Sequence, residues 1–548
     1  MLQLNRVLFF FTIVFLLNSC RTDPSKLNQE AKDKGFVYMN GKQFMVNDSV
    51  FFPVLMNYML DFMEIDGEII PVPNVQYDSL NIHVGTTKGE WVGQLENHFE
   101  LLNKLGFNTI RLVGYNSDKY NESGELLINL YDRIGNYERV RFESHHDEFE
   151  NAVNKAIELA SKHHLKVMIL LPNHRQNTIE ETSRIDFIKN TYALFKENNT
   201  VFAYDLCNEP LYFDKADALA GVDQSRTKLS AYQLVTTWKK LFDSLVPYQL
   251  STIGFGEPLE VFEWDASILP IDFVSFHTYN PLRVPNEIYW WSKYIDKPLI
   301  ISETSLPSDN DSILYSSQSD FMEAAFKRAV DCGISGFGWW QFQDVYWGDN
   351  YEHNYTALLD HNGTTYLEDS SKVIYGGVKP AALKLNGLLD YKSTGICNCY
   401  NNYENIVGYK NYRVDGYIRD SITHEPIEGA IVRGYVENWS IASNTFTDKK
   451  GHFSLYSNDK MINLHITAPG YEMIYYYNDT EYERVNFEED INDIHLEYQN
   501  VHYKKYLKND SSNSNGIFTF KSDDFGQYIY YGKLNVVKIN KLDLEQLK

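Results

Sequence analysis

Short apolar runs alternate with longer amphipathic stretches along residues 36–389. The runs lack regular polar positions, which is typical of strands buried on both faces, whereas the longer stretches repeat apolar residues every three or four positions, as helices do. We therefore expect strands at residues 50–57, 108–113, 166–171, 201–206, 250–255, 271–277, 298–303 and 336–341. Helices are expected at residues 89–105, 147–164, 183–198, 230–245, 288–294 and 318–332.

This alternation indicates repeated βα units and an α/β fold class. The region 36–389 has the length of a (β/α)8 TIM barrel that carries loop insertions. A doubly wound open sheet is the alternative, but no glycine-rich phosphate loop follows the first strand, so a nucleotide-binding sheet is not supported. We predict a TIM barrel that uses no cofactor.

The pattern changes after Leu389. Residues 390–410 are polar and aperiodic, as expected of a linker, and residues 411–500 contain short strands separated by turn signals. The string DGYIRDSITHEPIEGAIVRGY, followed by TDKKGHFSL, resembles the carboxypeptidase regulatory-like β-sandwich. This resemblance implies a small all-β sandwich domain that serves as a structural module or binds partner proteins. The role of the extension 501–548 is not indicated by its pattern.

The N-terminus combines a basic residue with an apolar run that is too short to span a membrane. Arg6 precedes the run 7–17, and Asn-Ser-Cys follows it. Residues 1–20 resemble a bacterial lipoprotein signal peptide, which implies cleavage before Cys20 and lipidation of that cysteine. Residues 21–35 then form a tether, and Arg21 favours the outer membrane, on its periplasmic face or at the cell surface. An ordinary secretory signal, which would release the protein, is the alternative.

Composition narrows the choice of ligand. The net charge of −24 argues against nucleic-acid binding, which needs a basic face, while 40 Tyr and 9 Trp suit a carbohydrate ligand, because sugar rings stack on aromatic side chains. The five cysteines have no zinc-binding spacing, so no metal site is predicted. Cys207 and Cys332 are expected to be small buried apolar residues. For Cys397 and Cys399 a strained disulfide and a plain linker feature both stay open.

The candidate chemistry lies at the ends of two expected strands. VFAYDLCNEP ends in Glu209, and KPLIISETS contains Glu303. In a parallel barrel the carboxyl ends of the strands meet on one face, where catalytic residues sit. Two carboxylates on that face suggest glycosidic bond cleavage.

Six motifs in register resemble a clan A glycoside hydrolase of family 5, the cellulase and mannanase type. The motifs are GFNTIRL with Arg111, NHR with His174, LCNEP with Asn208 and Glu209, SFHTY with His277 and Tyr279, ISET with Glu303, and GWWQ with Trp340. The resemblance implies a retaining hydrolase in which Glu303 is the nucleophile and Glu209 the acid/base. It also implies that a polysaccharide or oligosaccharide is the binding partner.

The other motif residues are expected to bind substrate or orient the two glutamates. Arg111 lies among apolar residues, where its charge needs a carboxylate partner such as Glu303. His277 and Tyr279 are two apart on a strand end and therefore face the same side. In the family this tyrosine hydrogen-bonds the nucleophile.

Three further residues complete the expected substrate site. Asn208 is expected to donate its amide to the substrate 2-hydroxyl, and His174 to lie at the rim. Trp340 is the expected platform under the sugar, and its role passes to Trp339 if the strand register is shifted by one.

The sequence departs from the family at two points. Thr-Ser follows the nucleophile, and the tract 61–87 is an unusual insertion, so the sugar and linkage stay open between β-mannan and β-glucan types. Tyr58, Trp290, Trp291, Tyr346 and Trp347 are candidate sugar platforms on presumed rim loops; the alternative for each is a plain packing role.

Two other functions are weighed against this one. The first is another clan A glycosidase, exo-acting or specific for β-galactan. The second is a catalytically dead lipoprotein that only binds glycans. The presence of both glutamates together with Asn208 and Tyr279 favours an enzyme, because a binding protein needs no acid/base pair.

Overall fold

A computed structural model gives the fold of the chain. It describes residues 24–75, 84–114, 119–133, 135–214, 226–281, 283–346, 351–367, 371–399, 412–420, 422–435, 441–457, 461, 463–477 and 529–536. The signal peptide with Cys20 lies outside the described residues, as does Trp347.

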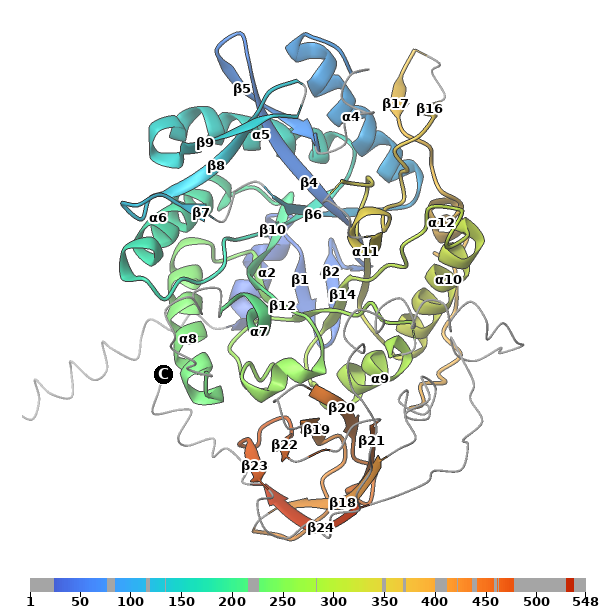
Figure 1. Cartoon of the computed structure of the whole chain (residues 1–548). Coiled ribbons are helices and arrows are strands. Elements are labelled where there is room, and N and C mark those ends of the chain that lie inside the picture. Colours follow the sequence, from blue (N-terminus) through green and yellow to red (C-terminus); the bar gives the residue numbers. More distant parts are fainter. Residues whose placement is uncertain are drawn as a thin grey trace, which may run out of the picture.

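Eight parallel strands form a closed barrel, as the sequence predicts (Figure 1). They are β4 (Val54–Ile65), β6 (Thr109–Val113), β10 (Lys166–Leu170), β11 (Val201–Asn208), β12 (Leu250–Phe255), β13 (Val274–His277), β14 (Leu299–Glu303) and β15 (Gly336–Trp339). The ring closes between the last and first of these, where Phe337 pairs with Val54 and Trp339 with Met56. This closure confirms the TIM barrel and excludes the open sheet.

Helices surround the barrel on its outer face. They are α4 (Lys88–Lys104), α5 (His146–Lys162), α6 (Thr178–Phe195), α8 (Lys228–Leu245), α9 (Val284–Tyr294), α10 (Tyr315–Asp331) and α12 (Pro380–Asn386), with the short helices α7 (Pro210–Phe213), η1 (Phe142–His145), η3 (Pro258–Phe262) and α11 (Tyr351–Asn354) in loops. Helix α4 begins at a capping box in which Thr87 and Glu90 bond each other's backbone N–H groups. Helix α6 begins five residues before the predicted start, at an Asn177 cap.

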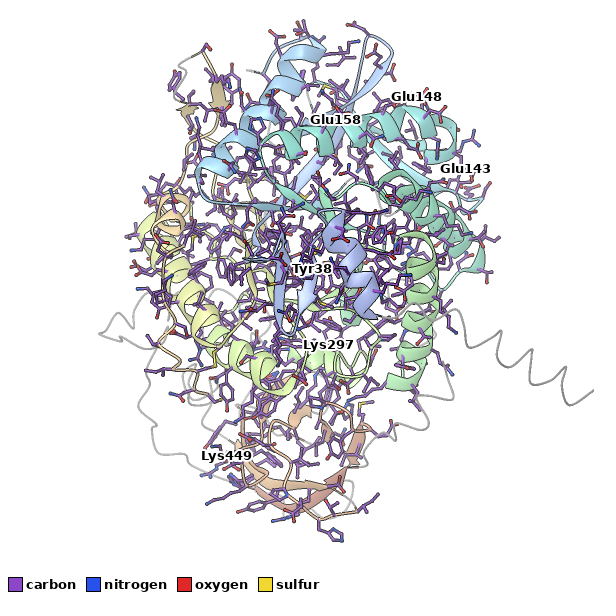
Figure 2. All side chains as sticks on the ribbon, turned by 180° about the vertical axis from the view of Figure 1, so that it is seen from behind. Tyr38, Glu143, Glu148, Glu158, Lys297 and Lys449 are labelled. Atoms are coloured by element: carbon purple, nitrogen blue, oxygen red, sulfur yellow. A yellow bond between two sulfur atoms is a disulfide. The ribbon has the colours of Figure 1, made fainter. Side chains whose placement is uncertain are left out.

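A small antiparallel sheet closes the amino-terminal end of the barrel. It consists of β1 (Tyr38–Asn40), β2 (Gln43–Val46) and β3 (Ser49–Phe51), preceded by α2 (Pro24–Asp33). Figure 2, which views the molecule from behind, shows Tyr38 of this sheet in front of the barrel. Phe44 from the sheet packs with Phe202 and Phe273 in a buried cluster that fills this end. The other end of the barrel is thereby left for the site.

The inserted tract after the first strand extends the barrel sheet. Strand β4 runs on to Ile65 and turns back as β5 (Glu68–Pro73), and β8 (Leu126–Tyr131) joins it with β7 (Lys119–Tyr120) and β9 (Tyr137–Arg141). Trp91 of α4 packs beneath this extension. The described part of the tract 61–87 is therefore a hairpin with its own apolar contacts.

A β domain follows the barrel and its closing hairpin, β16 (Thr364–Tyr366) with β17 (Val373–Tyr375). One sheet contains β18 (Tyr412–Asp420), β21 (His452–Ser457) and β24 (Ile529–Val536), and the other contains β19 (Ile431–Tyr435), β20 (Ile441–Phe446), β22 (Asn463–Thr467) and β23 (Ile474–Tyr477). A separate apolar cluster, including Val414, Leu455 and Ile466, lies between them. Strand β24 comes from the C-terminal extension, which the sequence pattern did not assign to any domain.

The β domain packs against the barrel beside α9, at the foot of Figure 1. The Trp290 indole N–H donates to the Gly429 carbonyl at 2.9 Å, and its ring lies 5.8 Å from that of Phe446. The buried Lys228 ammonium bonds both Asp265, at 2.8 Å, and the Ala468 carbonyl of the β domain, at 2.9 Å. The two parts therefore share buried polar contacts.

Several side chains expected on the rim are in the core instead. Tyr58, Trp290 and Trp291 are buried, so the prediction that they form sugar platforms on rim loops is wrong; Tyr346 is exposed, as expected. Trp290 and Trp291 lie in helix α9 beneath the β domain, and Tyr58 points out from β4 toward α4, where its hydroxyl bonds His98.

Cys332 and Cys397 form a disulfide bond. The expectation that Cys332 is an unpaired apolar residue is therefore wrong, because the segment after the barrel folds back over the end of α10. Cys207 is buried, as predicted, and neither Cys207 nor Cys399 forms a disulfide bond with another described cysteine. Within the described ranges, no helix is long and apolar enough to cross a membrane.

Candidate active site

Glu209 stands where strand β11 leaves the sheet. Its backbone is left-handed, with φ of 39°, and Pro210 begins helix α7 immediately after it. Its N–H still donates to the Gly254 carbonyl of β12, at 2.6 Å. A left-handed conformation is costly for a residue with a side chain, and such positions concentrate at functional sites. The turn presents the carboxylate at the open end of the barrel.

Glu303 ends strand β14 and is only 5% exposed. Its Oε1 accepts a hydrogen bond from Arg111 Nη1, and its Oε2 accepts one from the Tyr279 hydroxyl. Strand register places His277 beside it, and the His277 Nε2 atom lies 3.5 Å from Oε1. The arginine pairing that burial demanded is thus present.

These neighbours determine the charge of Glu303. Burial raises the pKa of its carboxyl, but the charge interactions with His277 and Arg111 and the hydrogen bonds from Tyr279 and Arg111 outweigh burial, so the pKa lies below its ordinary value. Burial, together with the neighbouring Glu303 charge, raises the pKa of Tyr279 well above its usual range. Glu303 is therefore a carboxylate and Tyr279 a neutral donor at neutral pH.

Arg111 joins the site to the barrel interior. It is fully buried, and besides Glu303 it donates to Asp205 through Nε at 3.0 Å and Nη2 at 2.8 Å, and to Asn57 at 3.0 Å. The paired strands β4 and β6 set Asn57 directly beside Arg111. Two carboxylates thus balance one guanidinium, which makes its burial tolerable.

Asp205 and Asn57 were missed by the sequence analysis. Both interrupt apolar strands, in VFAYDLC and PVLMNYM, and a polar residue at an otherwise apolar strand position is the signal that could have identified them. Gly254 is also required, because a Cβ there would stand 2.9 Å from the Asp205 carboxylate and 3.1 Å from His277 Nε2.

Asn208 is fixed at both its backbone and its side chain. Its Oδ1 accepts from Arg111 Nη2 at 2.7 Å, and its N–H donates to Asn173 Oδ1 at 2.9 Å. Since the side-chain oxygen is occupied by Arg111, the amide NH2 group is the part of Asn208 available as a donor to a ligand.

His277 is buried between the two glutamates. Its Nδ1 is hydrogen-bonded to Glu209 Oε1 at 2.6 Å. One carboxylate oxygen of Glu209, one of Glu303 and a ring nitrogen of His277 all lie within 4.8 Å of one another. This is the one such trio within the described residues, and it could in principle hold a cation. However, the Glu303 carboxylate is already ion-paired with the Arg111 guanidinium, which favours acid–base chemistry over metal binding.

One predicted site residue, His174, lies apart from the glutamates. His174 Nδ1 is 3.1 Å from Glu181 Oε2, and its ring packs 5.6 Å from Trp238. In the described part of the chain it contacts neither Glu209 nor Glu303.

The tandem tryptophans at the end of β15 are divided between core and site. Trp339 is fully buried, and its indole N–H donates to the Thr356 carbonyl at 2.9 Å. Trp340 follows it, is partly exposed, and its backbone N–H donates to Thr304 at 3.0 Å. The strand register that assigns Trp340 to the open face is therefore the one present, while its contact with sugar stays a prediction.

Among known proteins, solved structures match this chain with low sequence identity. No protein-family model matches the chain, and none of the curated proteins matches it. An endo-1,4-beta-mannanase from Rhizomucor miehei is 15% identical, with 56% of this chain and 90% of that chain covered and a TM-score of 0.40. An exo-beta-1,4-mannosidase from Opitutaceae bacterium strain TAV5 is 14% identical, with 64% and 61% covered and a TM-score of 0.43.

A third solved structure is beta-glucuronidase 2 of Bacteroides uniformis, which is 11% identical. The match covers 80% of this chain but 47% of that chain, with a TM-score of 0.43. The assignment of the fold rests on the closed ring of strands, and the functional argument rests on the geometry of the site.

Proposed function

We propose that this protein is a retaining glycoside hydrolase that cleaves β-glycosidic bonds, with Glu303 as nucleophile and Glu209 as acid/base. The observation that carries the proposal is that one oxygen of each strand-end carboxylate lies within 4.8 Å of the other, with a ring nitrogen of His277 within the same distance of both. Retaining enzymes hold their two carboxyl groups about 5 to 5.5 Å apart, whereas inverting enzymes need a wider gap for water.

In the first step Glu303 attacks the anomeric carbon of the substrate. The bond from that carbon to the leaving oxygen breaks, and Glu209 gives its proton to this oxygen, so a glycosyl ester of Glu303 and a free saccharide result. Arg111 and Tyr279 keep Glu303 ionised and fix its orientation before the attack. The Asn208 amide is placed to donate to the 2-hydroxyl, a bond that strengthens as positive charge develops on the ring.

In the second step water replaces the departed saccharide. Glu209, now a carboxylate, takes a proton from this water, whose oxygen attacks the anomeric carbon and breaks the ester bond to Glu303. Both glutamates return to their starting states, and the configuration is retained because the carbon has been inverted twice.

The proposed substrate is a β-linked polysaccharide or oligosaccharide of mannan or glucan type, following the motif resemblance to family 5. A catalytically dead glycan binder is disfavoured, because a binding site has no use for an ionised buried carboxylate facing a second carboxyl. The test is hydrolysis of β-mannans, β-glucans, xylans and galactans by protein lacking residues 1–20. Activity should vanish in Glu303→Gln and persist in Glu122→Gln, which alters an exposed glutamate. Binding without hydrolysis across the panel would contradict the proposal.

The proposed location is the bacterial outer membrane, to which a lipid on Cys20 would anchor the protein. The Cys332–Cys397 disulfide supports export, because structural disulfides are typical of oxidising compartments. Cys20→Ser should move the protein from the membrane fraction to the soluble fraction. Unchanged membrane partition, with no incorporation of labelled palmitate by the wild type, would contradict the lipid anchor.

A further inference from the structure

Tyr212 is an exposed aromatic residue three positions after the proposed acid/base. It lies on the short helix α7 and is 52% exposed, although large apolar rings are normally buried. It has no role in the two-step mechanism described above. An exposed ring that is held in one orientation and lies beside a catalytic carboxylate needs an explanation.

The tip of the Tyr212 ring is held in place. Its hydroxyl donates to Glu257, and the same carboxylate is ion-paired with Arg283. Arg283 is held in turn by Glu287, at 2.8 Å, and Glu287 accepts a hydrogen bond from Thr278, at 2.6 Å. Burial and the Glu257 charge raise the pKa of Tyr212, so its hydroxyl stays a neutral donor. The hydroxyl is thus occupied by protein, and the exposed surface that remains is the ring.

The helix beneath the ring is fixed as well. The Glu260 carboxyl accepts from the Leu211 N–H at 2.9 Å and from the Gly256 N–H at 3.1 Å, which ties α7 to the loop after β12. Burial raises the pKa of Glu260 well above its ordinary value. A neutral carboxylic acid can bridge two backbone donors without adding charge beside the site.

Gly256 shows how close the ring is to Glu209. A Cβ on Gly256 would stand 3.0 Å from Tyr212 Cε2 and 3.4 Å from the Glu209 carboxyl carbon. The ring edge and the carboxyl group therefore both lie beside Gly256. A side chain at position 256 would crowd both of them.

We infer that Tyr212 is the stacking platform for the saccharide on the leaving-group side of the scissile bond. The inference rests on the proposed function, because the acid/base gives its proton to the leaving oxygen and the departing sugar must therefore lie on the Glu209 side. A sugar presents a face of C–H groups, which packs well on an aromatic ring. Because the Tyr212 hydroxyl is bonded to Glu257, the ring stays at one angle whether or not a sugar is present, so little entropy is lost on binding.

The test separates the leaving saccharide from the rest of the reaction. β-1,4-Mannotriose and cellotriose release a sugar that would stack on Tyr212, whereas β-mannosyl fluoride and β-glucosyl fluoride release only fluoride. In Tyr212→Ala, kcat/KM for the trisaccharide that the wild type cleaves should fall by about tenfold or more. Hydrolysis of the matching fluoride should change by less than about twofold. Tyr212→Phe should stay close to the wild type on the trisaccharide, because it keeps the ring.

Phe213→Ala is the matched control. Phe213 is 40% exposed on the same short helix but is not bonded to the Glu257 pair, so its removal should leave the ratio of trisaccharide to fluoride hydrolysis unchanged. Reaction with added mannobiose or cellobiose gives a second readout. There the acceptor hydroxyl replaces water: it loses its proton to Glu209 and attacks the anomeric carbon, the ester bond to Glu303 breaks to free the Glu303 carboxylate, and a new glycosidic bond forms. Tyr212→Ala should raise the acceptor concentration needed for half-maximal transfer.

Three results would overturn the inference. Equal losses on trisaccharide and fluoride would mean that Tyr212 only supports the fold around Glu209. No loss on the trisaccharide would mean that the leaving sugar lies elsewhere. A loss in Tyr212→Phe as large as in Tyr212→Ala would assign the effect to the hydroxyl instead of the ring face. Failure of the wild type to hydrolyse any of the four substrates would instead contradict the proposed function, and the platform with it.

Discussion

The two glutamates occupy the same rim of one barrel, yet their surroundings differ. Glu303 is almost completely buried and accepts hydrogen bonds from two donors, one of them the Arg111 guanidinium. The Glu209 side chain is 21% exposed, stands on a left-handed turn and is hydrogen-bonded to His277. The protein thus fixes one carboxylate in its ionised form and leaves the other in reach of solvent.

In the proposed mechanism, this difference suits two identical side chains to opposite roles. A nucleophile must be ionised before substrate arrives, which the lowered pKa of Glu303 provides. An acid/base must lose and regain a proton in each cycle, which the solvent exposure of Glu209 allows. The surroundings therefore assign the roles, and changing them should alter each role separately.

Removing either carboxylate should have the largest effect, and the two variants should differ in the substrates that they still cleave. Glu303→Ala should lower kcat by about four orders of magnitude or more on every substrate, because no covalent intermediate can form. Glu209→Ala should lower kcat by a similar factor only on substrates whose leaving group needs a proton. It should spare the first step on dinitrophenyl glycosides. Azide should restore turnover in both, giving the α-glycosyl azide with Glu303→Ala and the β-glycosyl azide with Glu209→Ala. Identical behaviour of the two variants would contradict the division of roles.

Removing the guanidinium should disrupt the buried side alone. In Arg111→Met, Asp205 and Glu303 lose their shared counter-charge, so kcat should fall by about a thousandfold and the free energy of unfolding by about 3 kcal/mol or more. Arg184 offers a control, since it is also fully buried but lies away from Glu209 and Glu303. Its Nε donates to the Pro172 carbonyl at 2.7 Å. Arg184→Met should lower the melting temperature but leave kcat within about tenfold. A similar loss of kcat in both variants would mean that Arg111 only supports the fold.

The smallest change removes one hydroxyl from the buried side. In Tyr279→Phe, Glu303 loses a hydrogen bond that favours its ionised form, so its pKa should rise toward the ordinary carboxyl value. The acid limb of the kcat/KM profile should therefore move to higher pH, and activity at the optimum should fall by about tenfold. Tyr58→Phe, which removes a buried hydroxyl bonded to His98, should leave the acid limb in place. If the acid limb of the kcat/KM profile stays in place in Tyr279→Phe, the Tyr279 hydroxyl does not control the ionisation of Glu303.

The barrel itself was predictable because its strands are buried on both faces. Apolar runs such as those of β10 and β14 differ clearly from the helices between them, and each of the eight expected strands overlaps an observed one. Two things were not predictable. Strand β4 continues past the barrel into a hairpin, and β24 reaches the β domain from the far end of the chain. Both depend on pairing with distant partners, which local pattern does not record.

The site could be predicted where a motif ended a strand, and also at Arg111, whose charge among apolar residues called for a carboxylate partner. Strand-end position brought Glu209, Glu303, His277 and Tyr279 to one place, but it gave no signal for Asp205, which lies inside β11 and reaches Arg111 only once the barrel closes. The prediction that Trp290 and Trp291 form sugar platforms was wrong for a related reason. Amphipathic helix α9 has an apolar outer face because the β domain covers it, and the sequence shows the apolar residues without showing what covers them.

The stereochemistry of hydrolysis tests the central claim most directly. Proton NMR can follow the first seconds of reaction on a β-linked oligosaccharide or aryl glycoside, before the released hemiacetal equilibrates between its anomers. If Glu303 forms a covalent intermediate and Glu209 then activates water on the same side, the first signal should be that of the β-anomer. An initial α-anomer would mean a single displacement by water, and it would contradict the assignment of Glu303 as nucleophile.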